Sequence, residues 1–282
     1  MPDPTVLLDR LEFGESLRWH DDRLWIANWG KAEIVAVDIN GLSEIKRDVP
    51  TTFPFSIDWL PDGRLLVIAG REAVLLRRET DGSLVTHADL SPFGSVFNEL
   101  VVEGRGYSYV NGGGSDPMTD QAFAPGLVVL VTPDGSAREV AEGIDFGNGM
   151  AVTPDNRTLI VAESYGNQLS AFDIAEDGSL SGRRVWANLG QGVPDGICLD
   201  AGGAVWYADV PAMRCVRVAE GGRVLETVQL DRGAFSCMLG GADGQSLFIA
   251  ASIWRGMDHM MDEEHNGQVL IVDVTTPHVG WP

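Results

Sequence analysis

Cysteine is scarce in this chain. Only Cys198, Cys215 and Cys237 occur among its 282 residues. An odd number of widely spaced cysteines argues against a disulfide-stapled fold and favours free thiols in a reducing compartment. The first residues, Met-Pro-Asp-Pro-Thr-Val, also lack the basic and apolar regions of a secretory signal peptide. We therefore expect a cytoplasmic protein.

Basic residues and long apolar runs are scarce as well. Lys and Arg number 20 against 41 Asp and Glu, and the formal net charge is −21. A nucleic-acid partner is not expected, because phosphate binding needs a basic surface. A membrane partner is not expected either, since no apolar run approaches the roughly 20 residues of a membrane span. The excess of carboxylates keeps the protein in solution or holds cations.

What the sequence does contain is a six-fold repeat. Each copy has a short first strand, a polar turn, a nearly continuous apolar second strand and a third strand. The copies open 41 to 50 residues apart, at Glu15, Ser56, Asn98, Asn148, Asp195 and Cys237. A repeat of this length made only of strands is typical of a β-propeller. We predict an all-β, six-bladed β-propeller with four antiparallel strands per blade, formed by residues 1–282 as one domain.

The two ends of the chain are complementary. The sixth copy ends after its third strand, whereas residues 5–11 have no partner in the first copy. We predict that this N-terminal strand becomes the outer strand of the last blade. It would close the ring and hide the edges of that blade.

The first residue of each copy should lie on one ring around the mouth of the central channel. Glu15, Asn98, Asn148 and Asp195 carry oxygen ligands there, which suit a hard divalent cation, Ca²⁺ before Mg²⁺ or Mn²⁺. No Cys or His occurs on the ring in a spacing typical of Zn²⁺, which makes zinc the weaker candidate. The alternative is that these residues are polar simply because water fills the channel.

Nucleophilic catalysis by Ser or Cys is disfavoured. The other two ring positions hold Ser56 and Cys237, but no histidine occupies a matching position. The Gly-x-Ser-x-Gly motif of serine hydrolases does not occur.

Three motifs resemble those of the SMP-30/gluconolactonase/LRE-like family, which contains regucalcin-like lactone hydrolases with six-bladed propellers. They are Gly14-Glu15-Ser-Leu-Arg-Trp, Asn148-Gly-Met-Ala-Val-Thr-Pro-Asp and Pro194-Asp195-Gly-Ile-Cys-Leu-Asp, and the resemblance covers nearly the whole chain. It implies one divalent metal ion held by Glu15, Asn148 and Asp195, with Asp195 doubling as general base. It also implies that Asn98-Glu99, which stands where the family has an Asn-Asp pair, binds the metal or the substrate.

One departure from the family points to a hydrophobic substrate. Sugar-lactone members carry an arginine two residues before that asparagine, where this chain has Val96 in the apolar stretch Pro-Phe-Gly-Ser-Val-Phe. Aromatic side chains expected near the same mouth are either ordinary core or the walls of an apolar pocket. The substrate-binding candidates among them are Phe53, Phe97, Phe146, Tyr165 and Trp254.

The connection 254–266 adds His259 and His265 to the same end of the channel. His259 could move protons near neutral pH, although a charged, solvated loop is the alternative interpretation. Together these features predict metal-dependent hydrolysis of a small molecule, a lactone or related ester, by a monomer or small homo-oligomer. An isomerase or cyclase reaction at the same site, or a non-catalytic propeller that binds calcium or a ligand, are the alternatives.

Overall fold

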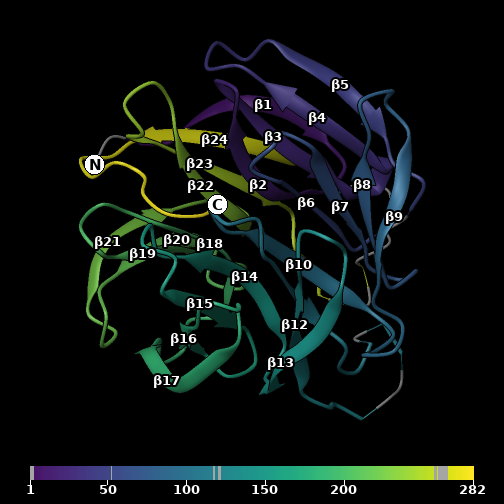
Figure 1. The fold of residues 1–282 in the computed structure, drawn as a ribbon. Helices are drawn as coiled ribbons and strands as arrows, with labels where there is room; N and C mark the ends of the chain where they lie inside the picture. Colours follow the sequence, from purple (N-terminus) through teal and green to yellow (C-terminus); the bar gives the residue numbers. More distant parts are fainter. Residues whose placement is uncertain (1–2, 52, 117, 120–121, 257–258, 260–265) are drawn as a thin grey trace.

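Six four-stranded antiparallel sheets are arranged in a ring, so the predicted six-bladed β-propeller is confirmed (Figure 1). The computed structural model describes residues 3–51, 53–116, 118–119, 122–256, 259 and 266–282. A single 3₁₀ turn, η1 (Trp29–Lys31), interrupts the strands of this described part. The described residues contain no helix with the length and hydrophobicity needed to cross a membrane.

Strands follow the chain outward from the axis in blades one to five. Blade one contains β2 (Gly14–His20), β3 (Arg23–Asn28), β4 (Glu33–Val37) and β5 (Ser43–Asp48). Blade two contains β6 (Phe55–Trp59), β7 (Leu65–Ala69), β8 (Val74–Arg78) and β9 (Leu84–Asp89). Blade three contains β10 (Phe97–Val102), β11 (Ser108–Gly112), β12 (Gly126–Val131) and β13 (Ala137–Ile144).

The second half of the ring repeats this order. Blade four contains β14 (Gly147–Val152), β15 (Thr158–Glu163), β16 (Gln168–Ile174) and β17 (Leu180–Asn188). Blade five contains β18 (Pro194–Leu199), β19 (Val205–Asp209), β20 (Arg214–Val218) and β21 (Val224–Gln229). Blade six contains β22 (Gly233–Gly240), β23 (Ser246–Ser252) and β24 (Gly267–Asp273), and its outer strand is β1 (Thr5–Leu11).

The pairing of β1 with β24 confirms the predicted closure of the ring. Thr5 lies opposite Ile271, and Leu11 lies opposite Gly267, in an antiparallel register with two bulges. The chain then passes directly into β2, the innermost strand of blade one. The first and last blades are therefore joined by a strand rather than by side-chain packing alone.

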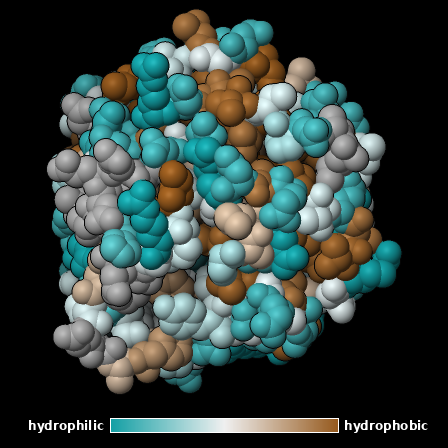
Figure 2. All heavy atoms as spheres, turned by 180° about the vertical axis from the view of Figure 1, so that it is seen from behind, coloured by the Kyte–Doolittle hydropathy of each residue, from teal (hydrophilic) through white to brown (hydrophobic). Residues whose placement is uncertain are grey.

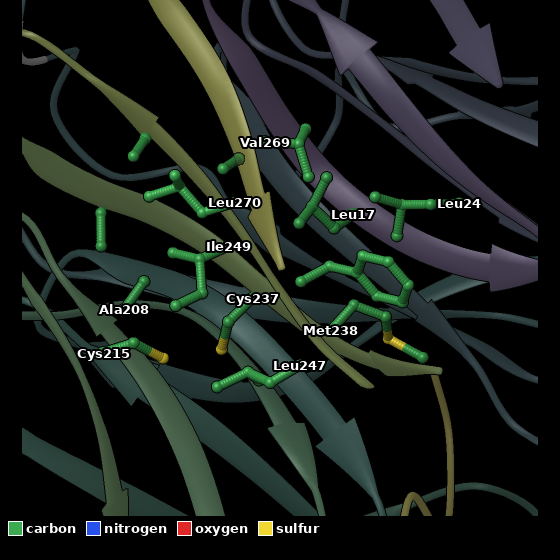
Figure 3. Close-up of a cluster of buried hydrophobic side chains, with 14 of the residues drawn as sticks. Leu17, Leu24, Ala208, Cys215, Cys237, Met238, Leu247, Ile249, Val269 and Leu270 are labelled. Carbon is green, nitrogen blue, oxygen red and sulfur yellow. The ribbon is translucent and has the colours of Figure 1, made fainter. Parts of the chain in front are cut away.

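Apolar second strands explain why the blades pack as they do. All five residues of β7, all five of β19 and all seven of β23 are buried. Strands covered on both faces need such continuous apolar runs. At the interface of blades five and six, Cys215 and Cys237 pack with Ala208, Leu247 and Ile249 (Figure 3). All three cysteines are buried free thiols.

The turns between first and second strands lie at the end of the channel opposite the inner-strand starts. In the turn of blade two, Gly63 adopts φ +83° and Asp62 Oδ1 accepts the Arg64 backbone N–H at 3.0 Å. The C-terminal segment also crosses this end, where Trp281 pairs with Val152 and His278 with Asp200. Figure 1 looks onto this end, with the C-terminus near the axis.

Candidate functional site

The starts of the inner strands bring the four predicted ligands to one pocket. Each is the second residue of its strand, Glu15 in β2, Asn98 in β10, Asn148 in β14 and Asp195 in β18, and all four line a cavity of about 140 Å³. Figure 2 shows the end of the propeller opposite the one that faces the reader in Figure 1, with hydrophobic side chains near the middle among hydrophilic ones. The shared position in four repeats thus becomes a shared location in space.

The two carboxylates lie in an unusual electrostatic environment. Glu15 is buried, with Oε2 accepting the Ser16 backbone N–H at 3.1 Å. Asp195 Oδ1 is buried and has no hydrogen-bond partner. Within the described part of the chain, no ion pair joins either carboxylate to a cationic side chain. Two such groups cost free energy when both are ionised, because a buried charge needs a partner.

The free-energy cost of burying these two ionised carboxylates raises their pKa values. Burial raises the pKa of Glu15 well above its usual range, and the negative charges of Asp195 and Glu99 add to the effect. Burial also raises the pKa of Asp195 well above its usual range, followed by the charge of Glu99. A positive charge between the two carboxylates would stabilise their ionised forms and lower both pKa values.

Two amide side chains, Asn98 and Asn148, lie in the same pocket as the carboxylates. Asn98 Nδ2 donates to Asn148 Oδ1 at 3.0 Å, and Asn148 Nδ2 donates to Ser164 Oγ at 3.4 Å. Ser164 Oγ in turn donates to the Pro194 carbonyl at 2.7 Å, which ties the start of β14 to the start of β18. These bonds fix the Asn148 amide and leave its oxygen a second lone pair for a ligand.

These residues fit a hard divalent cation. Among the described residues no group of three His, Cys, Asp or Glu side chains forms a metal site. The convergent set is instead two carboxylates, Glu15 and Asp195, and two amides, Asn98 and Asn148. Oxygen-only sets of this kind suit Ca²⁺ or Mg²⁺, and the unpartnered Asp195 Oδ1 supplies a donor atom that nothing else satisfies.

Glu99 belongs to the channel below this pocket rather than to its lining. It is buried, and its Oε1 accepts hydrogen bonds from Arg18 Nη2 at 3.0 Å and Ser16 Oγ at 3.3 Å. Arg18 also lies 3.7 Å from Asp58, whose pKa burial raises to about 6. Glu99 therefore lies outside the described lining, with Oε1 engaged by Arg18 and Ser16, and its negative charge acts on Glu15 and Asp195.

Aromatic rings form the walls of the pocket. Phe53 and Phe146 line it as predicted, together with Trp29 and Phe235. Phe13 stacks on Trp29 and meets Phe235 edge-on, with ring centroids 5.6 and 4.5 Å apart. In blade six the lining residue is therefore Phe235, and Cys237 lies deeper, its Sγ donating to the Gly196 carbonyl at 3.4 Å.

Three aromatic candidates lie outside the lining. Phe97 is fully buried in the apolar cluster between blades two and three, because its ring enters the core. Trp254 packs edge-on against Phe235, with the ring centroids 5.7 Å apart. Tyr165 is exposed and stacks on Phe146 at 4.6 Å. None of these three residues is among the described residues that line the pocket, so this placement gives no support to their contact with a substrate.

Of the two histidines predicted near the mouth, the described part of the chain includes one. His259 is exposed and does not belong to the pocket lining. His265 lies outside the described residues. Nothing in the described structure places a histidine beside Asp195.

The lining includes Arg71, Asp116, Met118 and Phe123, none of which sequence reasoning named as a site residue. Arg71 follows β7, while Asp116, Met118 and Phe123 come from the connection between β11 and β12. The length of that connection was the one available signal for the latter three. The sequence holds no signal for Arg71, because its position in the pocket depends on Asp116, a partner 45 residues further along the chain.

Comparisons with known proteins agree with this architecture. The family model described as "SMP-30/Gluconolactonase/LRE-like region" matches residues 13–253. A regucalcin of Xenopus laevis is 32% identical over 47% of this chain and 46% of its own length. A 6-deoxy-6-sulfogluconolactonase of Pseudomonas putida is 28% identical over 56% of each chain. These alignments thus span about half the length of the two relatives.

The structural similarity to a solved protein is high although the sequence identity is low. A luciferin-regenerating enzyme of known structure superposes with a TM-score of 0.83 over 98% of both chains, at 17% identity. At that identity the likeness shows the six-bladed architecture alone.

Proposed function

Because this chain belongs to the SMP-30/gluconolactonase/LRE-like family, we propose that it is a divalent-metal-dependent hydrolase of a lactone or a related ester. The observation that carries the proposal is the pair of buried carboxylates, Glu15 and Asp195, which form no ion pair with the described residues and line an apolar pocket. The Pseudomonas putida relative, whose name is that of a lactonase, supports the reaction class.

The residues that would hold the cation are Glu15, Asn148 and Asp195, with Asn98 beside them. The chemistry supplied by such a cation, when bound, is Lewis-acid polarisation of the substrate carbonyl. Asn98 orients Asn148 through the 3.0 Å hydrogen bond between their amides. Calcium is the cation that this oxygen set suits best, and Mg²⁺, Mn²⁺ or Zn²⁺ are the alternatives.

Asp195 is the residue that accepts a proton in the proposed reaction. A water molecule attacks the carbonyl carbon, the C–O bond of the ester breaks, and the proton lost by the water passes to a carboxylate oxygen of Asp195. The proton then goes to the departing alkoxide oxygen, which gives a hydroxy acid from a lactone, or an acid and an alcohol from an open-chain ester. A carboxylate in a water-poor site is a competent base for this step.

The aromatic walls have a second role in the proposal. Trp29, Phe53, Phe146 and Phe235 surround the reacting position and limit the entry of bulk water. They also present surface that favours an apolar body in the substrate. The proposed substrate therefore carries alkyl or aryl groups next to its lactone or ester.

Metal binding gives the first prediction. We expect protein purified without added metal to contain about one equivalent of a divalent cation, because a preorganised oxygen set retains its ion. Elemental analysis measures it, with Asp195→Ala as the depleted variant and Asp273→Ala, at an exposed strand end, as the control. Less than a tenth of an equivalent, with no rise in Tm when Ca²⁺, Mg²⁺, Mn²⁺ or Zn²⁺ is added, would contradict the proposal.

Selectivity gives the second prediction. A polar sugar would leave hydroxyls unpaired against these walls, at about 1–3 kcal/mol for each. An apolar substrate would instead gain about 0.8 kcal/mol for each buried methylene. We therefore expect kcat/KM to be higher for an aliphatic or an aryl lactone than for D-glucono-δ-lactone, measured with metal-loaded protein.

The chelated protein is the control for this panel, and it should be inactive on all three substrates. A preference for the sugar would refute the apolar-substrate part of the proposal. If metal-loaded protein turned over none of the three, a non-catalytic binding module or an isomerase-type reaction would take the place of hydrolysis.

A further inference from the structure

Arg71 is the one cationic side chain among the described residues that line the pocket. It follows β7 in the turn of residues 70–73, which is fixed by hydrogen bonds from Gly70 N–H to the Pro54 carbonyl and from Ala73 N–H to the Gly70 carbonyl. The pocket therefore carries two carboxylates, Glu15 and Asp195, at its floor and the Arg71–Asp116 ion pair at one side. A substrate that enters meets an electric field with a fixed direction.

Three contacts hold the guanidinium of Arg71 in place. Its Nε donates to the Phe53 carbonyl at 3.2 Å, and its Cζ lies 5.3 Å from the centre of the Phe53 ring. Its Nη1 donates to Asp116 Oδ2 at 2.8 Å. Nη2 makes no hydrogen bond to the described residues, so one edge of the fork is open to a ligand.

Asp116 is itself fixed, which leaves the open edge of Arg71 in a defined orientation. Asp116 Oδ1 accepts the Met118 backbone N–H at 2.9 Å, and its side chain is only 12% exposed. Burial opposes ionisation of Asp116, but the hydrogen bonds from Arg71 and Met118 outweigh it, and the pKa of this carboxyl is lowered. Asp116 therefore competes, as an anion, with any other acceptor for the guanidinium.

We propose that Arg71 recognises an anionic substituent of the substrate, a carboxylate or a sulfonate, carried at a distance from the reacting carbonyl. This rests on the proposed hydrolysis at Glu15 and Asp195 and names its substrate class: lactones or esters with an apolar body and an acidic tail. A guanidinium fork binds such oxyanions with charge-assisted hydrogen bonds. The carboxylates at the floor repel the same tail, so the ester is directed to the floor and the anion to the side.

The overall charge of the protein makes this local cation necessary for an anionic substrate. A net charge of −21 repels anions from the surface as a whole. One fixed guanidinium inside a partly desolvated pocket acts at short range, where screening by salt is weaker. Specificity then arises from Arg71 itself and not from general attraction.

The competing role for Arg71 is purely structural, as a tie between blade two and the β11–β12 connection. The two roles predict different results for neutral and charged substrates. The probes are 3,4-dihydrocoumarin and its 6-carboxylate, which share one reacting lactone. The variants are Arg71→Met, Arg71→Lys and Asp116→Asn. The control is Arg64→Met, at the other end of β7, where Arg64 pairs with Asp62 at 2.6 Å.

Recognition by Arg71 predicts a charge-dependent change in KM. Arg71→Met should raise KM for the carboxylate at least about tenfold and change KM for the neutral lactone less than about threefold, with kcat affected little. Arg71→Lys should lie between, because it keeps the charge and loses the fork. Asp116→Asn should lower KM for the carboxylate, since a competing anion is removed. Arg64→Met should change neither substrate. Equal changes for both substrates in Arg71→Met and Asp116→Asn would overturn the proposal.

A binding measurement separates failure of this proposal from failure of the proposed hydrolysis. Calorimetry with benzenesulfonate and benzenesulfonamide, on chelator-treated protein, compares an anion with its neutral isostere away from any metal. Wild-type protein should bind the sulfonate at least about tenfold more tightly than the sulfonamide, and Arg71→Met should not discriminate. That result without turnover of any lactone would retain the anion site and reject the hydrolase. Equal sulfonate affinities in wild type and Arg71→Met would reject the anion site itself.

Discussion

The Asp195→Asn variant is expected to lose nearly all turnover while keeping its fold. Asparagine preserves the size of the side chain and one oxygen ligand but removes the charge and the basicity. A positioned general base contributes on the order of 10²–10⁴-fold in rate, so kcat should fall by that factor. The measurement is steady-state hydrolysis of the preferred lactone at saturating metal.

Saturating metal matters because Asp195 has two proposed roles. A variant that has merely lost affinity for the cation regains kcat as metal is added, whereas a variant without its base does not. The control is Asp273→Asn, at the exposed end of β24, because this aspartate neither binds the metal nor acts as the base in the proposal. More than a tenth of wild-type kcat in metal-loaded Asp195→Asn would exclude Asp195 as the base.

Thermal stability offers a second readout on the same variant. In the absence of metal, burial and the negative charge of Glu99 raise the pKa of Asp195, which means that its ionised form destabilises the folded protein. Asparagine at this position carries no charge at any pH. We therefore expect metal-free Asp195→Asn to melt no lower than metal-free wild type, and to gain less in Tm than wild type when metal is added.

The fold was predictable because each repeat carries its own signals. Apolar runs such as Leu65–Ala69 and residues 205–208 favour strands covered on both faces, and six copies of them at one period indicate a ring of blades. The common phase of Glu15, Asn98, Asn148 and Asp195 then placed four polar side chains in one pocket. Local pattern and global architecture agree at these positions.

The walls of the site were less predictable, because they depend on side-chain direction and on bulges. Phe97 and Asn98 are neighbours, yet Asn98 lines the pocket and Phe97 enters the core, since successive side chains of a strand point to opposite faces. In β22 the register shifts between Ala234 and Ser236, so Phe235 reaches the mouth and Cys237 does not. A bulge of this kind cannot be predicted from a single sequence.

The position of Arg71 in the pocket could not be predicted from the sequence for a different reason. Its orientation is set by Phe53 and Asp116, which belong to the entry to blade two and to the long connection of blade three. No repeat partner has an equivalent residue that would mark the position. The absence of an arginine at Val96 correctly indicates an apolar surface there, but it says nothing of a guanidinium that approaches from another blade.

Removal of residues 1–11 is expected to destabilise the entire propeller, not only one edge. The deletion leaves β24 as an unpaired outer strand and exposes the apolar side chains that β1 covers. Leu11 is 5% exposed within the largest core cluster, and Leu7 and Leu8 pack against that cluster. Burying a leucine completely is worth about 1.5–3 kcal/mol, so one full and two partial burials amount to about 3–6 kcal/mol.

A loss of that size is a large fraction of the ordinary stability of a protein, about 5–15 kcal/mol. In a chain of this length it should lower Tm by on the order of 10 °C, measured by calorimetry or circular dichroism. Because the deletion could prevent folding altogether, Leu11→Ala provides a milder test with an expected cost of about 2–5 kcal/mol. Val6→Ala is its matched control on the same strand, since Val6 is 52% exposed and should cost little.

The ring-closing role of β1 also predicts how the destabilisation is distributed. If β1 joins the first and last blades, its loss should lower the melting of all six blades together, in one transition, because closure affects every interface in the ring. Hydrogen exchange would then rise in β14–β16 on the far side of the ring as well as in β22–β24. A truncated protein that melts within a degree or two of wild type, or a Leu11→Ala variant no less stable than Val6→Ala, would show that the ring is held by blade packing alone.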